Sequence, residues 1–458
     1  MKALPTFILL LVSQVLFAQN LSEKILDNLL IQFLEESDLP GVSVCVNRDG
    51  NLVYSKGFGY ADLENKVNMT ASTQIRAASV SKMITVTALA KLVSDGKLDL
   101  DSPISQYIEG LSSSLQNLTT RQIASHTAGL PHQPKSERSK RGDFVSSQEL
   151  IDLVEETELL FEPGTDYKYS TLGYNLLAGV IEGASGKTYL DYLQNDIFIP
   201  LEMNQTFPDD EDELSQADAK MYFFKKEKLV LDKQYFKGNY KLPGAGFKST
   251  SQDLAKMMDA YTNGMISTEA QRDVLKEVLL SNGKATGVSL GWRLNTDLSG
   301  RRTIEHAGNW QGARTVIVHF PEEKLTISIM INAQCTVFIE EMAQMIGQLF
   351  LNNLVQNESL VKIRGPVSGN KTSDNSIKIN GEILLSEEGN GRLSLDSEYQ
   401  FLNESPILYL GFEDNYALIT EFGPLFLKLS NGQKPFGEIF LFQAFDREKP
   451  SFIEFHLK

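Results

Sequence analysis

Residues 77–90 read Ala-Ala-Ser-Val-Ser-Lys-Met-Ile-Thr-Val-Thr-Ala-Leu-Ala, and this stretch decides how the rest of the chain is interpreted. Its apolar residues surround the whole helix axis, which predicts a helix buried on all sides. Ser79 and Lys82 are three residues apart, so they would share one face at the start of that helix. Burial lowers the pKa of a lysine, and such a lysine can take a proton from a hydroxyl. The stretch therefore predicts a nucleophile beside its base.

Two other interpretations compete with this one. Ser79 could simply cap a helix while Lys82 is a solvated surface charge. A second serine, Ser289, lies in residues 287–291, which read Gly-Val-Ser-Leu-Gly and match Gly-x-Ser-x-Gly. That motif supplies a nucleophile only at a turn from a strand into a helix, and residues 292–294 predict a strand instead. Ser79 is therefore the stronger candidate.

The composition limits the classes of function. The 458 residues are 42% hydrophobic, as in a globular protein, and the formal net charge of −16 argues against a nucleic-acid partner. No His or Cys spacing typical of a metal site occurs, so we expect no metal and no cofactor. Cys45 and Cys335 are too few for a disulfide scaffold, and the sequence leaves open whether they pair. The expected partner is a small-molecule or peptide substrate.

The chain divides by composition into four parts. Residues 1–18 have Lys2, an apolar core and a small residue, Ala18, before Gln19, which predicts a cleavable signal peptide and a secreted or periplasmic protein. That apolar core is short for a membrane span, and nothing later predicts one. Residues 19–361 form the expected main domain. Residues 362–375, rich in Gly, Ser and Asn, predict a linker, and residues 376–458 predict a small antiparallel β domain of unknown role.

Local patterns in the main domain predict an α+β fold. A helix is expected over residues 22–36, followed by a strand over 41–46 and a hairpin turn at Asp49-Gly50. A second hairpin is expected around residues 321–323, and a helix over 338–354 closes the domain. The segment between the hairpins is mostly helical. These elements indicate an antiparallel sheet flanked by N- and C-terminal helices, with a mostly helical subdomain.

Three motifs together resemble the serine β-lactamase and penicillin-binding protein superfamily. They are Ser79-Val80-Ser81-Lys82, Tyr169-Ser170-Thr171 and His306-Ala307-Gly308. They are most similar to the branch of class C β-lactamases, D,D-peptidases and family VIII esterases. Further stretches similar to the family occur in the family's order, at residues 125–131, 162–164, 173–177 and 243–246. The whole resemblance covers roughly residues 25–355. It implies a β-lactamase/transpeptidase-like fold.

The resemblance also implies catalytic roles. Ser79 would attack a carbonyl and form an acyl-enzyme. Lys82 and Tyr169 would share the proton transfers, with the Lys82 cation holding a phenolate-like state of Tyr169.

Four further residues would bind substrate. The backbone N–H groups of Ser79 and Asn309 would form the oxyanion hole. Gly308 would let its strand approach the substrate, and His306 would place a donor near the substrate's carboxylate or leaving group. Thr171 stands where this branch has asparagine, and its hydroxyl has a shorter reach and no NH₂.

The leading hypothesis is a secreted serine hydrolase acting through acyl-Ser79. Its substrate would be a D-amino-acid peptide or amide, a small ester, or a β-lactam. The alternative is a catalytically weak or inactive binding protein that keeps the fold, and Thr171 is the feature that favours it. Nothing in the sequence indicates the oligomeric state.

Overall fold

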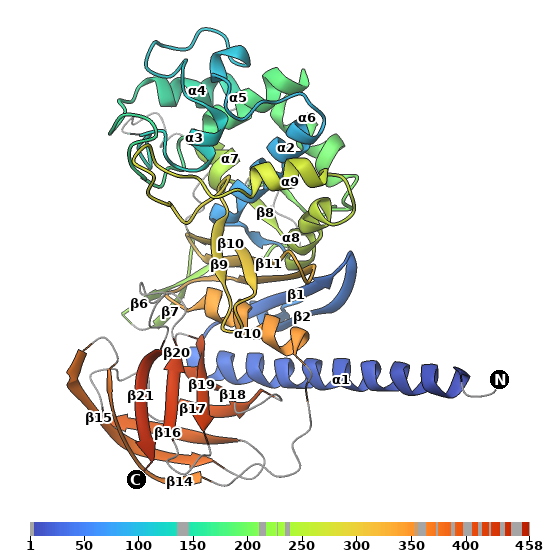
Figure 1. The fold of residues 1–458 in the computed structure, drawn as a ribbon, viewed down its shortest axis with the longest axis vertical. Coiled ribbons are helices and arrows are strands. Elements are labelled where there is room, and N and C mark those ends of the chain that lie inside the picture. Colours follow the sequence, from blue (N-terminus) through green and yellow to red (C-terminus); the bar gives the residue numbers. More distant parts are fainter. Residues whose placement is uncertain are drawn as a thin grey trace. The chain divides into compact units, whose positions relative to one another are not determined.

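The computed structural model describes residues 4–457, apart from 135–145, 210–216, 227, 234–238, 353, 355–362, 372–373, 386–389, 397–404, 411–414, 421–422, 431–435 and 441–450. The chain divides into two compact units (Figure 1). The larger unit is Pro40–Cys335, and the smaller one combines Met1–Leu39 with Thr336–Lys458.

The larger unit is built on a seven-stranded antiparallel sheet with strand order β3-β2-β1-β12-β11-β10-β9. Its strands are β1 (Gly41–Arg48), β2 (Asn51–Asp62), β3 (Val67–Asn68), β9 (Arg293–Thr296), β10 (Arg302–Trp310), β11 (Ala313–Phe320) and β12 (Leu325–Ile331). The pairing of β1 with β12, which sets Val44 opposite Ile329, joins the first hairpin to the last strands. Both predicted hairpins are confirmed. Asp49 and Gly50 have φ angles of 50° and 77°, as a two-residue hairpin turn requires.

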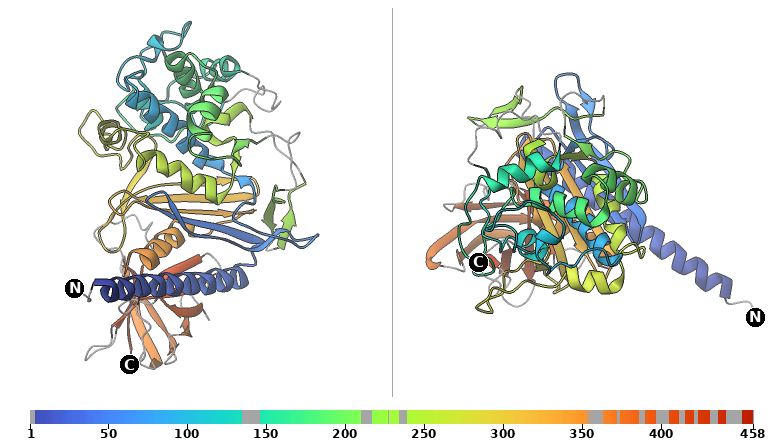
Figure 2. Two further views of the ribbon diagram at one scale, coloured as in Figure 1. Left: turned by 90° about the vertical axis from the view of Figure 1, so that its right-hand side faces the viewer. Right: turned by 90° about the horizontal axis from the view of Figure 1, so that it is seen from above.

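Helices cover one face of this sheet. Helix α8 (Ser251–Met257) packs directly on β1 and β12, and the other helices of the unit lie beyond it (Figure 2). They are α2 (Ser81–Ser94), α3 (Thr120–Ala124), α4 (Ser147–Glu155), α5 (Tyr174–Ser185), α6 (Tyr189–Tyr192), α7 (Leu242–Ala245) and α9 (Thr268–Val274). Every residue of helix α2 from Ser81 to Ala90 is buried, which confirms the prediction of a helix buried on all sides over that stretch.

A short three-stranded sheet, β4-β8-β5, lies at the start of α2. Its strands are β4 (Ile75–Arg76), β8 (Phe247–Ser249) and β5 (Phe207–Pro208). The N–H of Ala77 extends this contact by donating to the carbonyl oxygen of Phe247 at 2.8 Å. The sheet thereby anchors the residues that lead into Ser79. A further small sheet joins β13 (Ala333–Gln334), β6 (Tyr222–Lys225) and β7 (Lys228–Leu231).

The smaller unit is a closed antiparallel barrel with two helices, α1 (Leu4–Ser37) and α10 (Ile339–Leu351). The barrel strands are β14 (Ile363–Lys371), β15 (Asp374–Leu385), β16 (Asn390–Asp396), β17 (Ser405–Tyr409), β18 (Asn415–Thr420), β19 (Gly423–Ser430), β20 (Phe436–Phe440) and β21 (Ser451–Leu457). Helix α1 contacts β18, β19 and α10, and α10 contacts β19. The predicted α+β class with a small all-β part is confirmed.

Helix α1 includes the predicted helix 22–36 and extends back to Leu4. The signal peptide over residues 1–18 stays a prediction. Over the part of the chain that the structure describes, no helix combines the length and apolarity needed to cross a bilayer.

The linker predicted over residues 362–375 is corrected by the structure. Residues 363–371 form β14, which pairs with β15 on one side and β21 on the other. Gly and Ser weaken a strand in isolation, but hydrogen bonding to two neighbours in a closed barrel outweighs that local preference. The domain boundary near residue 361 stays a prediction. The structure groups α1 and α10, which precede that residue, with the barrel strands that follow it.

A chain truncated after Val361 should be less stable than the full chain. Removing β18 and β19 deprives α1 and α10 of the strands they contact, and exposes apolar surface worth about 25 cal/mol per Å². We expect a lower melting temperature and lower recovery in the supernatant, with residues 40–335 retaining their secondary structure. Thermal unfolding followed by circular dichroism measures this. An unchanged melting temperature would place the boundary near residue 361.

Candidate active site

Ser79 lies on a sharp turn from strand β4 into helix α2. Residues 78–80 form a single 3-10 turn that continues directly into α2. Ala78, which is fully buried, has a φ of 49°, a left-handed conformation that costs an alanine about 1–2 kcal/mol. Such strain persists only where the surroundings impose it, and it is concentrated at functional sites. The strand–turn–helix geometry that a serine nucleophile needs is therefore present at Ser79.

Gly308 allows strand β10 to pass directly against this turn. A methyl group on Gly308 would lie 2.6 Å from the carbonyl oxygen of Ala77 and 3.0 Å from the backbone nitrogen of Ser79. The first distance is shorter than real carbon contacts and the second is tighter than most of them, so any side chain here would displace the turn. The close approach predicted for Gly308 is thus made to the backbone around Ser79.

A buried ion pair between Arg76 and Asp209 also anchors the turn that carries Ser79. The guanidinium of Arg76 donates to the carboxylate of Asp209 at 2.7 Å and to the carbonyl oxygen of Gln311 at 2.9 Å. The hydroxyl of Thr315 donates to the carbonyl oxygen of Arg76 at 3.0 Å. These contacts fix the residue three positions before Ser79 to β11 and to the β10–β11 turn.

Lys82 is the second residue of α2 and is completely buried. Its Nζ donates to Thr171 Oγ1 at 3.0 Å and to the carbonyl oxygen of Gly244 at 2.8 Å. Burial, and secondarily the positive charge of Arg293, lowers the pKa of Lys82 well below its usual value. The site therefore favours a neutral amine, which is the proton-accepting form.

Tyr169 connects the serine to the lysine. Its hydroxyl faces the side chains of Ser79 and Thr171, both of which act to lower its pKa, and Lys82 Nζ lies 4.7 Å from the centre of its ring. Burial raises the pKa of Tyr169, and its neighbours, Ser79 first among them, only partly oppose this effect. The phenol form is favoured, contrary to the phenolate-like state that the family resemblance implied. Thr171 links Tyr169 to Lys82, so the four side chains form one chain of contacts.

Three histidine rings lie near that of Tyr169, those of His126, His132 and His306. The ring of His126 lies 4.4 Å from that of Tyr169, and its Nδ1 accepts a hydrogen bond from the N–H of Ser170 at 3.2 Å. His126 thus positions the second motif, and its φ of 65° shows a backbone constrained for that purpose. The ring of His306 lies 6.2 Å from Tyr169, and burial lowers the pKa of His306 well below its usual value. His306 is accordingly a neutral side chain.

A narrow pocket of about 50 Å³ opens over Ser79. Of the residues predicted from the sequence, it contains Ser79, Thr171 and Asn309. Its complete lining is Ser79, His132, Gln133, Pro134, Thr171, Leu172, Tyr240, Lys241, Ala245, Asn309 and Trp310. The neighbouring strand β9 pairs with β10 only from Arg302 to Glu305, which leaves the later part of β10 without a described strand on that side.

Lys241 and Arg293 are site residues that the sequence reasoning missed. Lys241 directly precedes helix α7, and Arg293 lies at the start of the short strand β9. The one available signal for Lys241 was its position directly before the Leu-Pro-Gly-Ala-Gly stretch that resembles the family.

Ser289 does not have the environment of a nucleophile. It is fully buried, and its N–H donates to the carbonyl oxygen of Trp292 at 2.9 Å. Strand β9 follows at Arg293, as the sequence predicted, so the turn does not lead into a helix.

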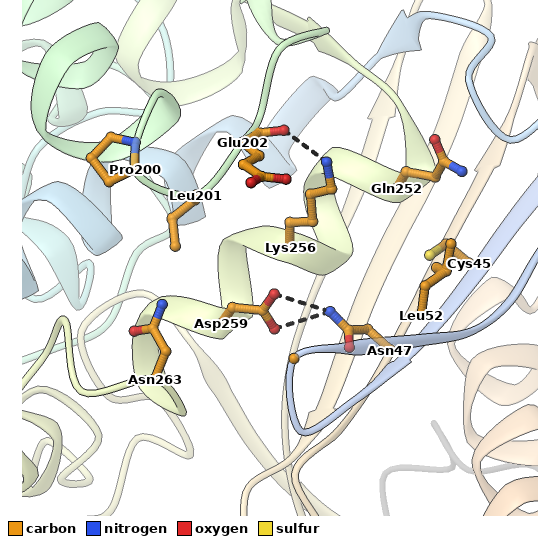
Figure 3. Close-up of a pocket in the computed structure, with 11 residues that line it drawn as sticks. Cys45, Asn47, Leu52, Pro200, Leu201, Glu202, Gln252, Lys256, Asp259 and Asn263 are labelled. Carbon is orange, nitrogen blue, oxygen red and sulfur yellow. Dashed lines mark hydrogen bonds between the residues drawn. The ribbon is translucent and has the colours of Figure 1, made fainter.

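A larger pocket of about 430 Å³ lies between the β1–β2 hairpin and α8 (Figure 3). Burial raises the pKa of its Cys45 thiol to about 12, which makes that thiol unreactive at neutral pH. Asp259, whose pKa burial raises to about 6, accepts two hydrogen bonds from Asn47. Its lining places no activated nucleophile beside a base.

The described part of the chain contains no group of three or more His, Cys, Asp and Glu side chains that could hold a metal ion. Cys45 and Cys335 are both free thiols.

Residues 26–344 match the family model named Beta-lactamase. The mitochondrial serine beta-lactamase-like protein LACTB of Homo sapiens is 32% identical over 306 residues, which are 52% of this chain and 56% of that protein. Penicillin-binding protein 4* of Bacillus subtilis (strain 168) is 27% identical over 330 residues, covering 67% and 71% of the two chains. The chain thus spans little more than half the length of the human relative.

Two solved structures share the fold. The octameric penicillin-binding protein homologue from Pyrococcus abyssi matches with a TM-score of 0.60 and 22% identity, over 94% of this chain and 99% of that one. The D-amino acid amidase from Ochrobactrum anthropi SV3 matches with a TM-score of 0.59 and 23% identity, over 72% and 96%. The fold and the Ser-x-x-Lys site define the class of serine β-lactamases and penicillin-binding proteins. The family model covers well over half of the sequence, so the chain belongs to the beta-lactamase family.

Proposed function

We propose that this protein is a serine hydrolase that forms an acyl-enzyme on Ser79. The observation that carries the proposal is the contact chain from Ser79 through Tyr169 and Thr171 to the buried Lys82. A lysine that only supported the fold would have no reason to be completely buried beside a serine on a strained turn. Together these groups provide a nucleophile, a neutral base and a route between them.

In the first half of the reaction, Ser79 Oγ attacks the substrate's carbonyl carbon. The hydroxyl proton passes to Tyr169 as Tyr169 passes its own proton toward Lys82, so no free phenolate needs to persist. Collapse of the tetrahedral intermediate breaks the bond to the leaving group, which takes the proton held by Lys82. Water then attacks the acyl ester by the same route in reverse, releasing the acid and restoring Ser79.

The oxyanion would bind the N–H groups of Ser79 and Asn309. An N–H in the first turn of a helix has no partner within that helix, and Gly308 brings β10 to within contact distance of the Ser79 nitrogen. Fixed N–H donors of this kind stabilise the charge that develops on the carbonyl oxygen by several kcal/mol, roughly 2.7–4 per donor.

The proposed substrates are D-amino-acid peptides or amides, small esters, and β-lactams, in that order. The name of the Ochrobactrum amidase supports an amide, and the name of the Bacillus penicillin-binding protein supports a β-lactam ligand. The predicted signal peptide supports an exported protein, and N-terminal sequencing of the mature chain should then begin near Gln19.

The substitution Thr171→Asn should raise the ratio of amide to ester turnover. The hydroxyl of Thr171 accepts a hydrogen bond from Lys82 and faces Tyr169, and threonine has no NH₂ group to offer a substrate carbonyl. An asparagine NH₂ would add a donor worth about 1.5–3 kcal/mol, or roughly tenfold or more in rate. The measurement is kcat/KM for a D-alanyl peptide, nitrocefin and a p-nitrophenyl ester. Equal changes for all three would show that Thr171 does not set specificity.

The alternative is a catalytically weak or inactive binding protein, which the threonine at 171 favours. Labelling with a fluorophosphonate and with a fluorescent penicillin, followed by peptide mapping, separates the two. A label on the peptide containing Ser79 supports the hydrolase. Reversible binding of penicillin without any covalent label would support the binding protein.

A further inference from the structure

The pocket of about 430 Å³ in Figure 3 is separate from the pocket over Ser79, because none of the described residues lines both. It lies between the β1–β2 hairpin, residues 200–202, and helix α8 with the 3-10 turn Met258–Tyr261 that follows it. Its volume falls within the range of about 300–1,000 Å³ that is typical of small-molecule sites. The pocket therefore has room for a ligand that the proposed hydrolase reaction does not account for.

Two opposite charges line this pocket without pairing. Lys256, in α8, and Asp259, in the 3-10 turn, are three residues apart, a spacing that places both on one face of the helix. Both are partly buried, and within the described residues neither a hydrogen bond nor an ion pair joins them. Figure 3 shows the ammonium of Lys256 directed toward the backbone of Glu202 and the carboxylate of Asp259 directed toward Asn47. A ligand can therefore contact the two charges separately.

Each of these charged groups keeps hydrogen-bonding capacity for a ligand. Lys256 Nζ donates to the carbonyl oxygen of Glu202 at 2.8 Å, and an ammonium has three N–H donors. The two carboxylate oxygens of Asp259 accept from a single nitrogen, Asn47 Nδ2, at 2.9 and 3.2 Å, and a carboxylate offers about four lone pairs. In the part of the chain that the structure describes, neither group has a further hydrogen bond.

Asn47 gives a second, independent indication of a ligand. Its side chain lines the pocket from β1 and is only 4% exposed, and its Oδ1 has no hydrogen-bond partner among the described residues. Buried amide oxygens in folded proteins are nearly always paired. An N–H group of a ligand bound at Asp259 would lie beside this amide and supply the missing donor.

The charges of the pocket favour a ligand that carries both signs. Among the described residues of the lining, Lys256 alone is positively charged, and it disfavours a simple cation. Asp259 and the exposed Glu202 carry the negative charges, and they disfavour a simple anion. Leu52 and Leu201 add apolar surface to the same lining, where an apolar side chain of a ligand could pack.

We propose that this pocket binds a free apolar α-amino acid as its zwitterion, with the ammonium at Asp259 and Asn47 and the carboxylate at Lys256. The site is not catalytic, because its lining places no activated nucleophile beside a base. Binding here uses no residue of the pocket over Ser79, so the assignment is independent of the hydrolase reaction and does not fail with it.

Calorimetry with leucine and two analogues tests the proposal on the wild-type chain. Both enantiomers of leucine are used, since the observations on the pocket do not select one. At least one should bind with a dissociation constant of about 1 mM or below. Leucinamide lacks the carboxylate and N-acetylleucine lacks the ammonium, so each should bind about tenfold to a hundredfold more weakly, the value of a charge-assisted hydrogen bond. Absence of binding by both enantiomers, or equal affinity for leucine and either analogue, would overturn the proposal.

Two variants assign the two ends of the ligand. Asp259→Asn should abolish the preference for leucine over N-acetylleucine, and Lys256→Met should abolish the preference for leucine over leucinamide. A residue that only supported the fold would weaken all three ligands alike, and the melting temperature of each variant checks the fold. Lys241→Met is the matched control, because it removes a lysine from the pocket over Ser79. It should leave leucine binding unchanged, and a loss there without a loss in Lys256→Met would place the ligand at Ser79 instead.

The pH dependence gives a further readout. Burial raises the pKa of Asp259 to about 6. The titratable groups around it are Lys256 on α8, Asp49 on the hairpin, Glu202, and Cys45, whose thiol stays neutral. Leucine is a zwitterion throughout pH 5–7, and its ammonium requires the ionised carboxylate, so its affinity should rise about tenfold from pH 5 to pH 7. Asp259→Asn should lose this dependence, and a dependence that persists in that variant would rule out Asp259 as the ammonium site.

Discussion

Ser79→Ala should lower kcat/KM for any accepted ester by at least about 10⁴-fold and abolish fluorophosphonate labelling. Alanine removes only the hydroxyl, so the strained turn at Ala78 and the contact with Gly308 remain in place. The residual rate would come from binding and the oxyanion hole alone. Steady-state kinetics and intact-protein mass spectrometry after labelling measure both effects.

Ser289→Ala is the matched control for this prediction. Ser289 is the other motif serine, but it is fully buried in a turn that leads into a strand. Its substitution should change kcat/KM by less than about threefold, apart from a small loss of stability. Two results would contradict the assignment of Ser79 as the nucleophile. One is that Ser79→Ala keeps more than a tenth of the activity, and the other is that Ser289→Ala loses most of it.

Local patterns identified most of the larger unit because its elements depend on near neighbours. The turn at Asp49-Gly50 needs two residues that tolerate positive φ, and the dipeptide Asp-Gly is a sequence signal for such a turn. The burial of α2 follows from apolar residues on every side. The strained conformation of Ala78 could not be predicted, because it is imposed by β10 and β8, which are distant in sequence.

Local sequence patterns did not predict the organisation of the smaller unit or the place of Lys241 in the active-site pocket. Residues 363–371 have the composition of a linker, and only their pairing with β15 and β21 makes them a strand. The assignment of α1 to the barrel rests on contacts with β18 and β19, which lie more than 300 residues later in the chain. Lys241 belongs to the pocket because Tyr240 and Pro243 are held by α5 and α2, and no local pattern encodes those contacts.

Lys82→Arg should lower kcat/KM by about 10²–10⁴-fold, the range for loss of a general base. The argument depends on the protonation state that burial imposes. The pKa of Lys82 is lowered, so its neutral form persists at lower pH than in an exposed lysine, whose pKa is about 10.4. Arginine keeps a positive charge at the position but cannot be deprotonated in a protein. In the wild type, kcat/KM should therefore rise with pH through the lowered pKa of Lys82 and reach a plateau below pH 10.

Lys91→Arg is the control on the same helix. Lys91 is partly exposed and pairs with Asp95 one turn away, so arginine should preserve both the ion pair and the activity. Arginine is larger than lysine and Lys82 is completely buried, so Lys82→Met, which is similar in length and uncharged, is measured in parallel with the melting temperature of each variant. If both substitutions at 82 keep the fold and lose turnover, the proton-accepting amine is the missing element. Retained activity in Lys82→Arg would instead show that the site needs only a positive charge there, with Tyr169 acting as the base in a phenolate form.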